Sequence, residues 1–326
     1  MTKPVLAIHG GAGAIARARA TPEVRERYEG ALRQILEDAG AILAGGGTAL
    51  DAVTKAVRLL EECPLFNAGH GAVFTNAGTH ELDAAIMDGS TLQSGAVAGV
   101  STVRNPVLAA RAVMEQGSYV FLMGPGAETF AHRQGIERVD PTFFSTEARR
   151  KELHRAQAAG GAMVLDHDGQ AGASEDAPAA SILAPLDEDQ KLGTVGAVAL
   201  DRHGNLAAAT STGGLTNKLP GRIGDTPLIG AGCYANNRTC AVSTTGTGET
   251  FIRMVAAYDV SAQMEYAGQS LGEATRVVVH EKLPTIGGDG GLIAVDANGN
   301  VSLPFNTGGM YRGYIRDGEN AWVAIH

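Results

Sequence analysis

The stretch GTVGAVAL, at 193–200, decides how this chain is interpreted, because the composition of the sequence changes there. The residues before it, from about 158 to 190, are rich in Gly, Ala, Ser, Asp and Pro, which predicts a flexible linker. The stretch itself is mostly apolar and predicts a buried strand. Gly193-Thr194 therefore lies where a linker meets a core strand.

The same stretch also opens a predicted hairpin. Residues 201–205, DRHGN, have the composition of a turn, and a second apolar run follows at 206–210. The pattern returns near the end of the chain, where DANGN at 296–300 separates the runs 291–295 and 301–304. Strands are thus expected at both ends of the second half.

Helices are expected in the rest of the chain. Thr21-Pro22-Glu23 has an N-cap, a proline at the first position and an acidic first turn, and Thr48 with Asp51 resembles a capping box. The expected helices cover residues 22–44, 48–61, 105–116, the segment after 125, 146–157, 249–258 and 270–282. With a first strand at 5–8, this order predicts an α+β fold in which helices cover sheets.

Composition excludes several classes of protein. The chain has 326 residues and a formal net charge of −9, and it contains no basic stripe of the kind that binds nucleic acid. No window of 18 uninterrupted apolar residues predicts a membrane span, and the N-terminus does not resemble a signal peptide. Its three cysteines are an odd number without dense spacing, which favours reduced thiols in the cytoplasm.

Common catalytic motifs are also missing from the sequence. It has no HExxH or paired CxxC spacing for a metal, no GxxxxGK[ST] phosphate loop and no GxSxG elbow. GAGCYANN, at 230–237, contains glycines but lacks the strand–GxGxxG–helix context of a nucleotide loop. We therefore expect no cofactor for catalysis.

Threonine and glycine gather instead in three short segments of the second half. They are GTVG at 193–196, TSTGG at 210–214 and STTGTGE at 243–249. The simple explanation is that threonine is common in strands and that glycine marks bulges, and composition alone favours this explanation.

The position of Thr194 points to chemistry. Cleavage before Thr194 would leave both flanking pieces packed and would give this residue a free α-amine, whose ordinary pKa of about 7.7–8.0 lets it accept a proton near neutral pH. A threonine hydroxyl is a weak nucleophile that needs an adjacent base, and an N-terminal threonine carries both groups. Gly193 has no Cβ and could hold the strained backbone that such a cut requires.

At this point the sequence resembles a known family, that of the plant-type asparaginases or isoaspartyl aminopeptidases, a branch of the N-terminal nucleophile hydrolases. The resemblance covers nearly the whole chain. The motifs that carry it, in order, are HGGAGA (9–14), LEECPLFNAGHGAVFT (60–75), ELDAAIMDG (81–89), GTVGAV (193–198), TSTGG (210–214), NKLPGRIGD (217–225), GAGCYANN (230–237) and TGTGE (245–249).

The resemblance implies a nucleophile and its helpers. Thr194 would be the nucleophile with its own amine as the base, and Thr212 would place a hydroxyl beside it. Thr245 and the amide of Gly246 would form the oxyanion hole. The cleavage site would be Gly193-Thr194.

The resemblance also implies a pocket for an amino-acid head group. Arg222 would bind the α-carboxylate, for which a guanidinium fork is suited, and Asp225 would bind the α-ammonium. Thr245, Gly246 and Gly248 would complete the pocket, and Asn67 would approach from the first half. The alternative for Arg222 and Asp225 is an ion pair on a surface loop.

By the same resemblance, the fold would be a four-layer αββα sandwich. Residues 1–193 would form an α subunit, with 158–193 a flexible linker before the cut, and residues 194–326 would form a β subunit around one shared core. The mature enzyme would be an (αβ)₂ heterotetramer. A structural Na⁺ would bind backbone carbonyls of the loop after the second helix, namely those of Leu60, Glu61, Cys63, Phe66, Ala68 and His70.

The implied reaction is hydrolysis of β-aspartyl dipeptides and of the side-chain amide of L-asparagine through a β-aspartyl-enzyme intermediate. A glycosylasparaginase-like hydrolase is an alternative, although that group pairs Asp with the threonine where this chain has Gly193. A taspase-like endopeptidase would need a longer insertion. The chain could instead be a small-molecule binding protein on the same fold that never cleaves itself.

Overall fold

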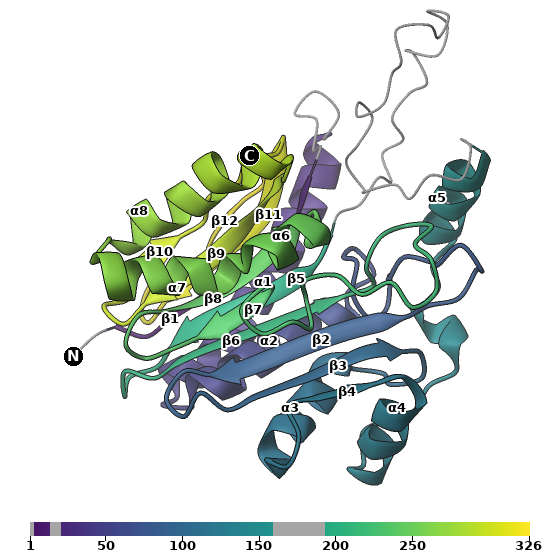
Figure 1. Cartoon of the computed structure of the whole chain (residues 1–326), viewed down its shortest axis with the longest axis horizontal. Helices are drawn as coiled ribbons and strands as arrows, with labels where there is room; N and C mark the ends of the chain where they lie inside the picture. Colours follow the sequence, from purple (N-terminus) through teal and green to yellow (C-terminus); the bar gives the residue numbers. More distant parts are fainter. Residues whose placement is uncertain (1–2, 14–20, 159–192) are drawn as a thin grey trace, which may run out of the picture.

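The computed structural model describes residues 3–13, 21–158 and 193–326. In this part of the chain, helices combine with an eight-stranded sheet and a four-stranded sheet, so the mixed helix-and-strand class expected from the sequence is confirmed (Figure 1). The linker predicted at 158–193 falls almost entirely outside the described residues.

The large sheet interleaves strands from both sides of Gly193. The strand β1 from the first half lies between β11 and β5 from the second, and β6 pairs with β2. In spatial order its strands are β12 (Trp322–Ala324), β11 (Gly309–Arg316), β1 (Val5–Gly13), β5 (Val195–Leu200), β6 (Leu206–Thr212), β2 (Leu82–Asp88), β3 (Ser94–Val100) and β4 (Phe121–Met123). Every pairing in it is antiparallel except that of β3 with β4.

The small sheet packs against one face of the large one. Its strands, in spatial order, are β10 (Val301–Ser302), β9 (Gly290–Asp296), β8 (Cys240–Gly246) and β7 (Cys233–Ala235). Alternate residues of β1, such as Val5 and Ala7, share a buried apolar cluster with Ile293 of β9 and Ala241 of β8. Apolar burial between the sheets therefore holds the ends of β5, β6 and β8 at a fixed separation.

Helices cover the outer faces of both sheets (Figure 1). Leu6 and Ile8, which alternate with Val5 and Ala7 along β1, belong to a second apolar cluster on the opposite face of the large sheet. The helices on this face are α1 (Pro22–Ala44), α2 (Ala49–Glu62), α3 (Pro106–Gln116) and α4 (Gly124–Arg133). On the outer face of the small sheet lie α6 (Gly248–Met254), α7 (Ala256–Ala267) and α8 (Leu271–Arg276).

The remaining helical segments are short, and Val278, Val279 and Leu283 among them belong to the buried apolar cluster on the outer face of the small sheet. These segments are α5 (Glu147–Ala158), the 3₁₀ turns Pro141–Phe144 and Leu283–Ile286, and the π-helical turn Val277–Lys282 that continues α8.

Several predicted helix boundaries are confirmed by their caps. The amide of Val24 donates to Thr21 Oγ1 at 3.3 Å, and the amide of Asp51 donates to Thr48 Oγ1 at 3.1 Å. Asn105 differs from expectation, since its side chain makes no cap bond and its Nδ2 donates to Glu62 Oε1 at 3.1 Å.

The single helix predicted at 249–258 is wrong, because the segment is broken into α6 and α7 at Val255. This residue has φ 49° and ψ 48°, a left-handed conformation that strains a β-branched side chain. The amide of Tyr258 donates to the carbonyl of Gly230 at 2.8 Å, and that of Ala257 donates to Ala231. Contacts with the distant 230–231 segment thus override local helix propensity.

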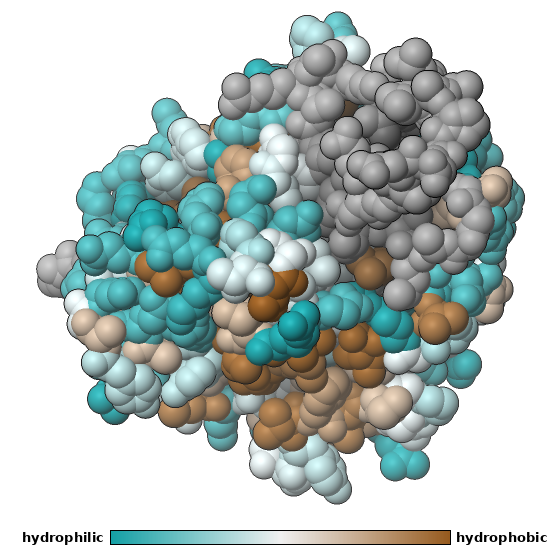
Figure 2. All heavy atoms as spheres, turned by 45° about the horizontal axis from the view of Figure 1, so that its top comes forward, coloured by the Kyte–Doolittle hydropathy of each residue, from teal (hydrophilic) through white to brown (hydrophobic). Residues whose placement is uncertain are grey.

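Figure 2 shows one face of the molecule, on which hydrophilic residues are widespread and apolar residues gather below the centre. Elsewhere, the strand β4 at the edge of the large sheet leaves Tyr119, Val120 and Met123 more than half exposed in and beside it. None of the helices in the described ranges is long and apolar enough to cross a membrane.

Candidate active site

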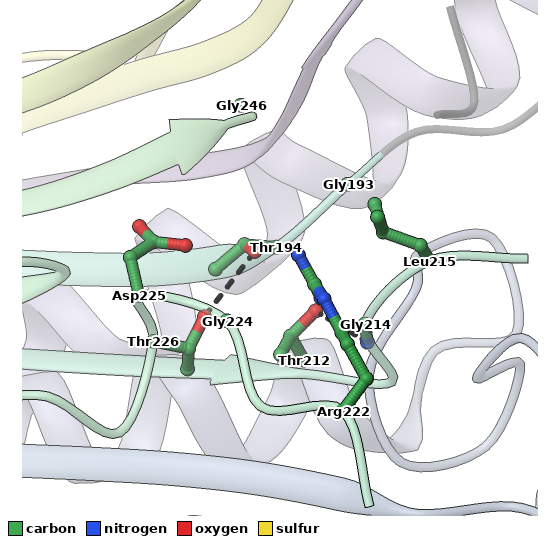
Figure 3. A pocket seen from close by; sticks show the side chains of 10 residues that line it. All are labelled: Gly193, Thr194, Thr212, Gly214, Leu215, Arg222, Gly224, Asp225, Thr226 and Gly246. Carbon is green, nitrogen blue, oxygen red and sulfur yellow. Dashed lines mark hydrogen bonds between the residues drawn. The ribbon is translucent and has the colours of Figure 1, made fainter. Parts of the chain in front are cut away.

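A pocket lies where β5 begins and where β6 and β8 end (Figure 3). Its free space is about 10 Å³, which is roughly the room that one water molecule needs. The residues that line it are Gly193, Thr194, Thr212, Gly214, Leu215, Arg222, Gly224, Asp225, Thr226 and Gly246. Six of the residues expected at the site from sequence are therefore among its walls, namely Gly193, Thr194, Thr212, Arg222, Asp225 and Gly246.

Thr194 stands immediately before β5 and is buried, with 6% of its surface exposed. Val195 pairs with Ser211 in the antiparallel register, so one further step along each strand brings Thr194 opposite Thr212. Thr194 Oγ1 lies 3.3 Å from Thr226 Oγ1, as the dashed line in Figure 3 marks. The Thr212 hydroxyl accepts a hydrogen bond from the Gly214 amide at 2.9 Å. Three threonine side chains thus meet at the start of β5.

Gly193 lies against Thr245, a residue of β8. A Cβ on Gly193 would lie 3.0 Å from Thr245 Oγ1, which is a tight contact that glycine avoids. The same hydroxyl accepts a hydrogen bond from the Ala12 amide at 3.3 Å, which ties β8 to β1. Thr245 is therefore beside the peptide unit that would be cut, although it does not line the pocket itself.

Gly246 must be glycine for steric reasons. Its φ is 153°, and a Cβ would lie 2.3 Å from the carbonyl oxygen of Asp289. Any side chain would push the end of β8 away from β9 and would displace the backbone amide that was predicted as an oxyanion donor.

Arg222 and Asp225 bring opposite charges to the same pocket. The Arg222 side chain is 11% exposed, and in Figure 3 it extends past Thr212 toward Thr194. Asp225 is buried, and its Oδ2 accepts a hydrogen bond from Thr244 Oγ1 at 2.6 Å. Burial raises the pKa of Asp225 to about 6, against the opposing effects of the Thr244 hydrogen bond and the Arg222 charge. This buried arrangement fits the binding of a zwitterionic ligand better than it fits the alternative, an ion pair on a surface loop.

Gly248 borders both charged groups. A Cβ there would lie 2.9 Å from Asp225 Oδ1 and 3.1 Å from Arg222 Nη2. Because Gly248 has no side chain, Arg222 and Asp225, the two groups predicted to hold an amino-acid head group, both border the space beside it.

Two polar partners of these charges were not predicted from the sequence. Glu249 accepts from Arg222 Nε at 3.0 Å and from Nη2 at 2.9 Å, and Thr244 binds Asp225. Thr226, the neighbour of Thr194, was also missed. Glu249 and Thr244 lie inside the quoted STTGTGE segment, so its density of hydroxyl and acidic groups was the available signal.

The loop that carries Arg222 is pinned to the first half of the chain. Lys218 is fully buried and its Nζ donates to the carbonyl of Glu81 at 2.7 Å, while Glu81 Oε2 accepts from the Gly221 amide at 2.7 Å. Asn67 Nδ2 donates to the Gly214 carbonyl at 2.8 Å. Asn67 therefore braces the turn after Thr212 and does not line the pocket.

The loop after α2 offers main-chain oxygens of the kind expected for a hard cation. It curls back on itself, since the His70 amide donates to the Glu61 carbonyl at 2.7 Å. Gly69 permits this with φ 51°, and a Cβ there would lie 2.3 Å from the same carbonyl oxygen. No cluster of His, Cys, Asp and Glu suited to a metal occurs among the residues with described positions. Carbonyl oxygens are ligands of the kind that a hard cation such as Na⁺ prefers. The His70 ring packs on Phe143, with ring centroids 5.3 Å apart.

His9 lies beneath the start of β5 and serves packing. It is fully buried, its Nε2 lies 2.8 Å from Ser243 Oγ, and burial lowers its pKa to about 3 despite a backbone hydrogen bond with Thr194. Cys233 and Cys240 are buried in β7 and β8, and burial raises the pKa of each thiol to about 12. None of these three groups is poised for nucleophilic or acid–base chemistry at neutral pH.

Comparison with known proteins identifies the family of this chain and several similar proteins. A sequence profile described as asparaginase matches residues 2–325, and the chain belongs to this asparaginase family. It is 61% identical over 326 residues to the isoaspartyl peptidase of Salmonella typhimurium, covering 100% of this chain and 99% of that protein. The isoaspartyl peptidase of Escherichia coli K12 is also 61% identical, with 100% and 97% covered. The probable isoaspartyl peptidase/L-asparaginase 2 of Arabidopsis thaliana is 43% identical, with 98% of each chain covered.

Proposed function

We propose that this chain cleaves itself before Thr194 and then hydrolyses β-aspartyl dipeptides and the side-chain amide of L-asparagine. The observation that supports this most directly is the meeting of Thr194, Arg222 and Asp225 in one buried pocket immediately after Gly193. The bacterial relatives are named isoaspartyl peptidases, and the name of the plant relative adds L-asparaginase.

Self-cleavage would start with attack by Thr194 Oγ1 on the carbonyl carbon of Gly193. The new C–O bond forms, the peptide C–N bond breaks, and the hydroxyl proton passes to the Thr194 nitrogen. Water then hydrolyses this ester, which leaves a carboxylate on Gly193 and returns the Thr194 hydroxyl. The free space of about 10 Å³ in the uncleaved pocket is too small for asparagine, so departure of Gly193 would also open the site.

Catalysis would then use the same pocket. Arg222 would bind the substrate α-carboxylate and Asp225 its α-ammonium, which aims the side-chain carbonyl at Thr194. The free amine would take the hydroxyl proton as Thr194 attacks, and the Thr245 hydroxyl and Gly246 amide would stabilise the oxyanion. Ammonia or an amino acid leaves with that proton, and water releases aspartate from Thr194. Thr212 would assist beside the nucleophile, while Gly248 leaves the head group its space and Asn67 braces the turn.

The proposal extends to the assembly. The two sheets and their helices would form the four-layer αββα sandwich of N-terminal nucleophile hydrolases, with an α subunit of 1–193 and a β subunit of 194–326 sharing one core. An (αβ)₂ heterotetramer would suit the exposed apolar side chains beside β4. Na⁺ held by the six carbonyls from Leu60 to His70 would fix the loop that contains Asn67. A cytoplasmic location rests on the cysteine count alone.

A denaturing gel and two assays test the proposed function. Purified protein should give two bands, and the smaller fragment should begin at Thr194 by N-terminal sequencing. It should release ammonia from L-asparagine and leucine from β-aspartyl-leucine. A single intact band that binds L-aspartate without turnover would instead identify a binding protein.

A further inference from the structure

The arginine expected to hold the substrate is itself held by a second residue. Glu249, in the first turn of α6, accepts from Arg222 Nε at 3.0 Å through Oε1 and from Nη2 at 2.9 Å through Oε2. A guanidinium has five N–H donors in a planar fork. Glu249 accepts from the donors of the side edge, which is formed by Nε and Nη2. The end edge, which is formed by Nη1 and Nη2, stays available for a second acceptor.

Two glycines lie directly against the guanidinium group of Arg222 and give it room inside the pocket. A Cβ on Gly224 would lie 3.0 Å from Nη1, and one on Gly248 would lie 3.1 Å from Nη2. Gly224 lines the pocket together with Asp225, whose Oδ1 borders the Gly248 space. Because Glu249 takes the side edge and Arg222 lines the pocket together with Asp225, the end edge is the bidentate edge left for a ligand carboxylate.

The contact with Glu249 is strong enough to matter for this geometry. The Arg222 side chain is 11% exposed and that of Glu249 is 48% exposed, so water screens the pair only in part. The pKa of Glu249 lies below its usual value: partial burial opposes this, and the hydrogen bonds and charge of Arg222 outweigh the burial. Glu249 is thus ionised throughout the neutral range and keeps its hold on the arginine.

A bidentate Arg–Glu pair is not by itself a sign of function. Arg104 makes the same side-edge contact with Glu62, at 2.9 and 3.0 Å, and its Nη1 is taken up by Glu137 at 3.0 Å. In that pair the end edge also meets a protein carboxylate. Arg222 differs because its end edge borders the pocket, so a ligand can supply the second carboxylate.

From this geometry we infer that Glu249 is a positioning residue that makes the site selective for a free α-carboxylate. It acts through Arg222 by occupying the side edge, which turns the end edge toward the head group of the substrate. Without it the guanidinium could rotate about its long side chain and would lose its alignment with Asp225. This inference rests on the proposed function, because it deepens the role of Arg222 in that site.

The test is the variant Glu249→Gln, assayed on L-asparagine and on its α-amide, which lacks the carboxylate. A glutamine side chain has only one oxygen that can accept a hydrogen bond, so one of the two bonds from Arg222 is lost. We expect KM for L-asparagine to rise about tenfold while kcat changes by less than about twofold, because the lost alignment weakens binding more than chemistry. The preference for L-asparagine over its α-amide should fall by a similar factor. Glu115→Gln, which removes a carboxylate from a pair with Arg111 on α3, should behave as wild type in both assays.

The outcomes separate this inference from the proposed function. A wild-type protein that neither cleaves itself nor releases ammonia refutes the proposed function. An active wild type with unchanged KM and substrate preference in Glu249→Gln refutes only the role of Glu249. Equal losses on the two substrates would show a merely structural contact and would also refute it. If Glu249→Gln does not mature, Glu249→Asp carries the same test, since its shorter carboxylate should give an intermediate preference and a wild-type preference would overturn the inference.

Discussion

The central strands of the molecule have two contrasting ends. At one end lie the turns between β5 and β6 and between β9 and β10, and at the other end lies the pocket. Asp201, at the turn end, is fully buried, yet its Oδ1 accepts from the amides of His203 and Asn205 and its Oδ2 from that of Ala49. Every oxygen of this carboxylate is thus used by the protein itself.

Asp225, at the pocket end, is also buried but accepts fewer hydrogen bonds from the rest of the protein. Its Oδ2 accepts from the Thr244 hydroxyl, and its Oδ1 borders the open space beside Gly248. The pKa of Asp225 is raised to about 6, because desolvation outweighs the Thr244 hydrogen bond, the Arg222 charge and a backbone hydrogen bond. A buried carboxylate with its donors filled belongs to the architecture, whereas one left short of donors is available for a ligand.

The largest expected effect comes from removing the group that makes the pocket end reactive. Thr194→Ala should abolish self-cleavage and lower kcat by about 10⁴-fold or more, since no other hydroxyl there carries an α-amine on the same residue. A denaturing gel and an ammonia assay measure the two effects. Thr194→Ser keeps both groups and should still split. If the alanine variant separated into two fragments, the pocket end would have to contain a different nucleophile.

Arg222→Ala should have the next largest effect. It removes the charge-assisted contacts to the α-carboxylate, so kcat/KM for L-asparagine should fall about 10²-fold, mostly through KM. Arg238→Ala, which removes the contact of the exposed Arg238 side chain with Glu265, serves as the control and should leave kinetics unchanged. An unaltered kcat/KM in the Arg222 variant would mean that the pocket end does not bind the head group as described.

The pH dependence of kcat/KM tests the raised pKa of Asp225. Below its pKa of about 6 the carboxyl is neutral and cannot pair with a substrate ammonium. The Thr194 amine, with an ordinary pKa of about 7.7–8.0, must also lose its proton. The log of kcat/KM should therefore fall with slope one below the amine pKa and steepen to slope two below about 6, because kcat/KM reports groups of the free enzyme.

The variant Asp225→Asn supplies the control for this profile. It should lower kcat/KM at every pH and should retain slope one at the acid end, because the asparagine side chain does not titrate. A second break near the same pH in that variant would assign the titration to another group.

Much of this contrast could be predicted from the sequence, and some of it could not. Thr194, Arg222 and Asp225 were expected in one site because the motifs that contain them resemble those of the asparaginase family, and the turn at 201–205 was expected from its composition. The contact of Glu249 with Arg222 joins residues 27 positions apart, and that of Asp201 with Ala49 joins residues 152 apart. Such pairings depend on how layers pack, which no local pattern encodes.

The break at Val255 shows the same limit in the backbone. Nothing in the sequence 249–258 ends a helix, because it contains no proline and no glycine. The break depends on hydrogen bonds from residues 257 and 258 to the 230–231 segment, so only tertiary structure reveals it.

At the turn end, Asp201→Ala should lower the stability of the protein and leave catalysis unchanged. It would leave three amide donors without their acceptor, one of them in the first turn of α2, and the free energy of unfolding should fall by about 2–3 kcal/mol. Urea unfolding of the purified protein measures this loss. A large rise in KM with unchanged stability would contradict the division between the two ends.

The smallest effect is expected from a substitution in another turn at the turn end, the one between β2 and β3. Asp88 again has its oxygens filled, by the amide and hydroxyl of Ser90 and by Thr91 Oγ1. Leu92 in this turn has φ 61° and is 51% exposed, so its side chain gains little from packing while its backbone is strained. Leu92→Asn should raise the free energy of unfolding by about 0.5–1 kcal/mol, because asparagine tolerates a conformation that costs other residues about 1–2 kcal/mol.

Thermal unfolding monitored by circular dichroism would detect this gain, and Leu92→Ala is the matched control. Alanine removes the exposed side chain but keeps a Cβ without a polar group, so it should bring little or no stabilisation. Equal gains in the two variants would show that exposure of Leu92, and not its backbone strain, is what costs stability. Since this turn does not contribute to the pocket, kcat/KM should stay at the wild-type value in both, as the separation of the two strand ends requires.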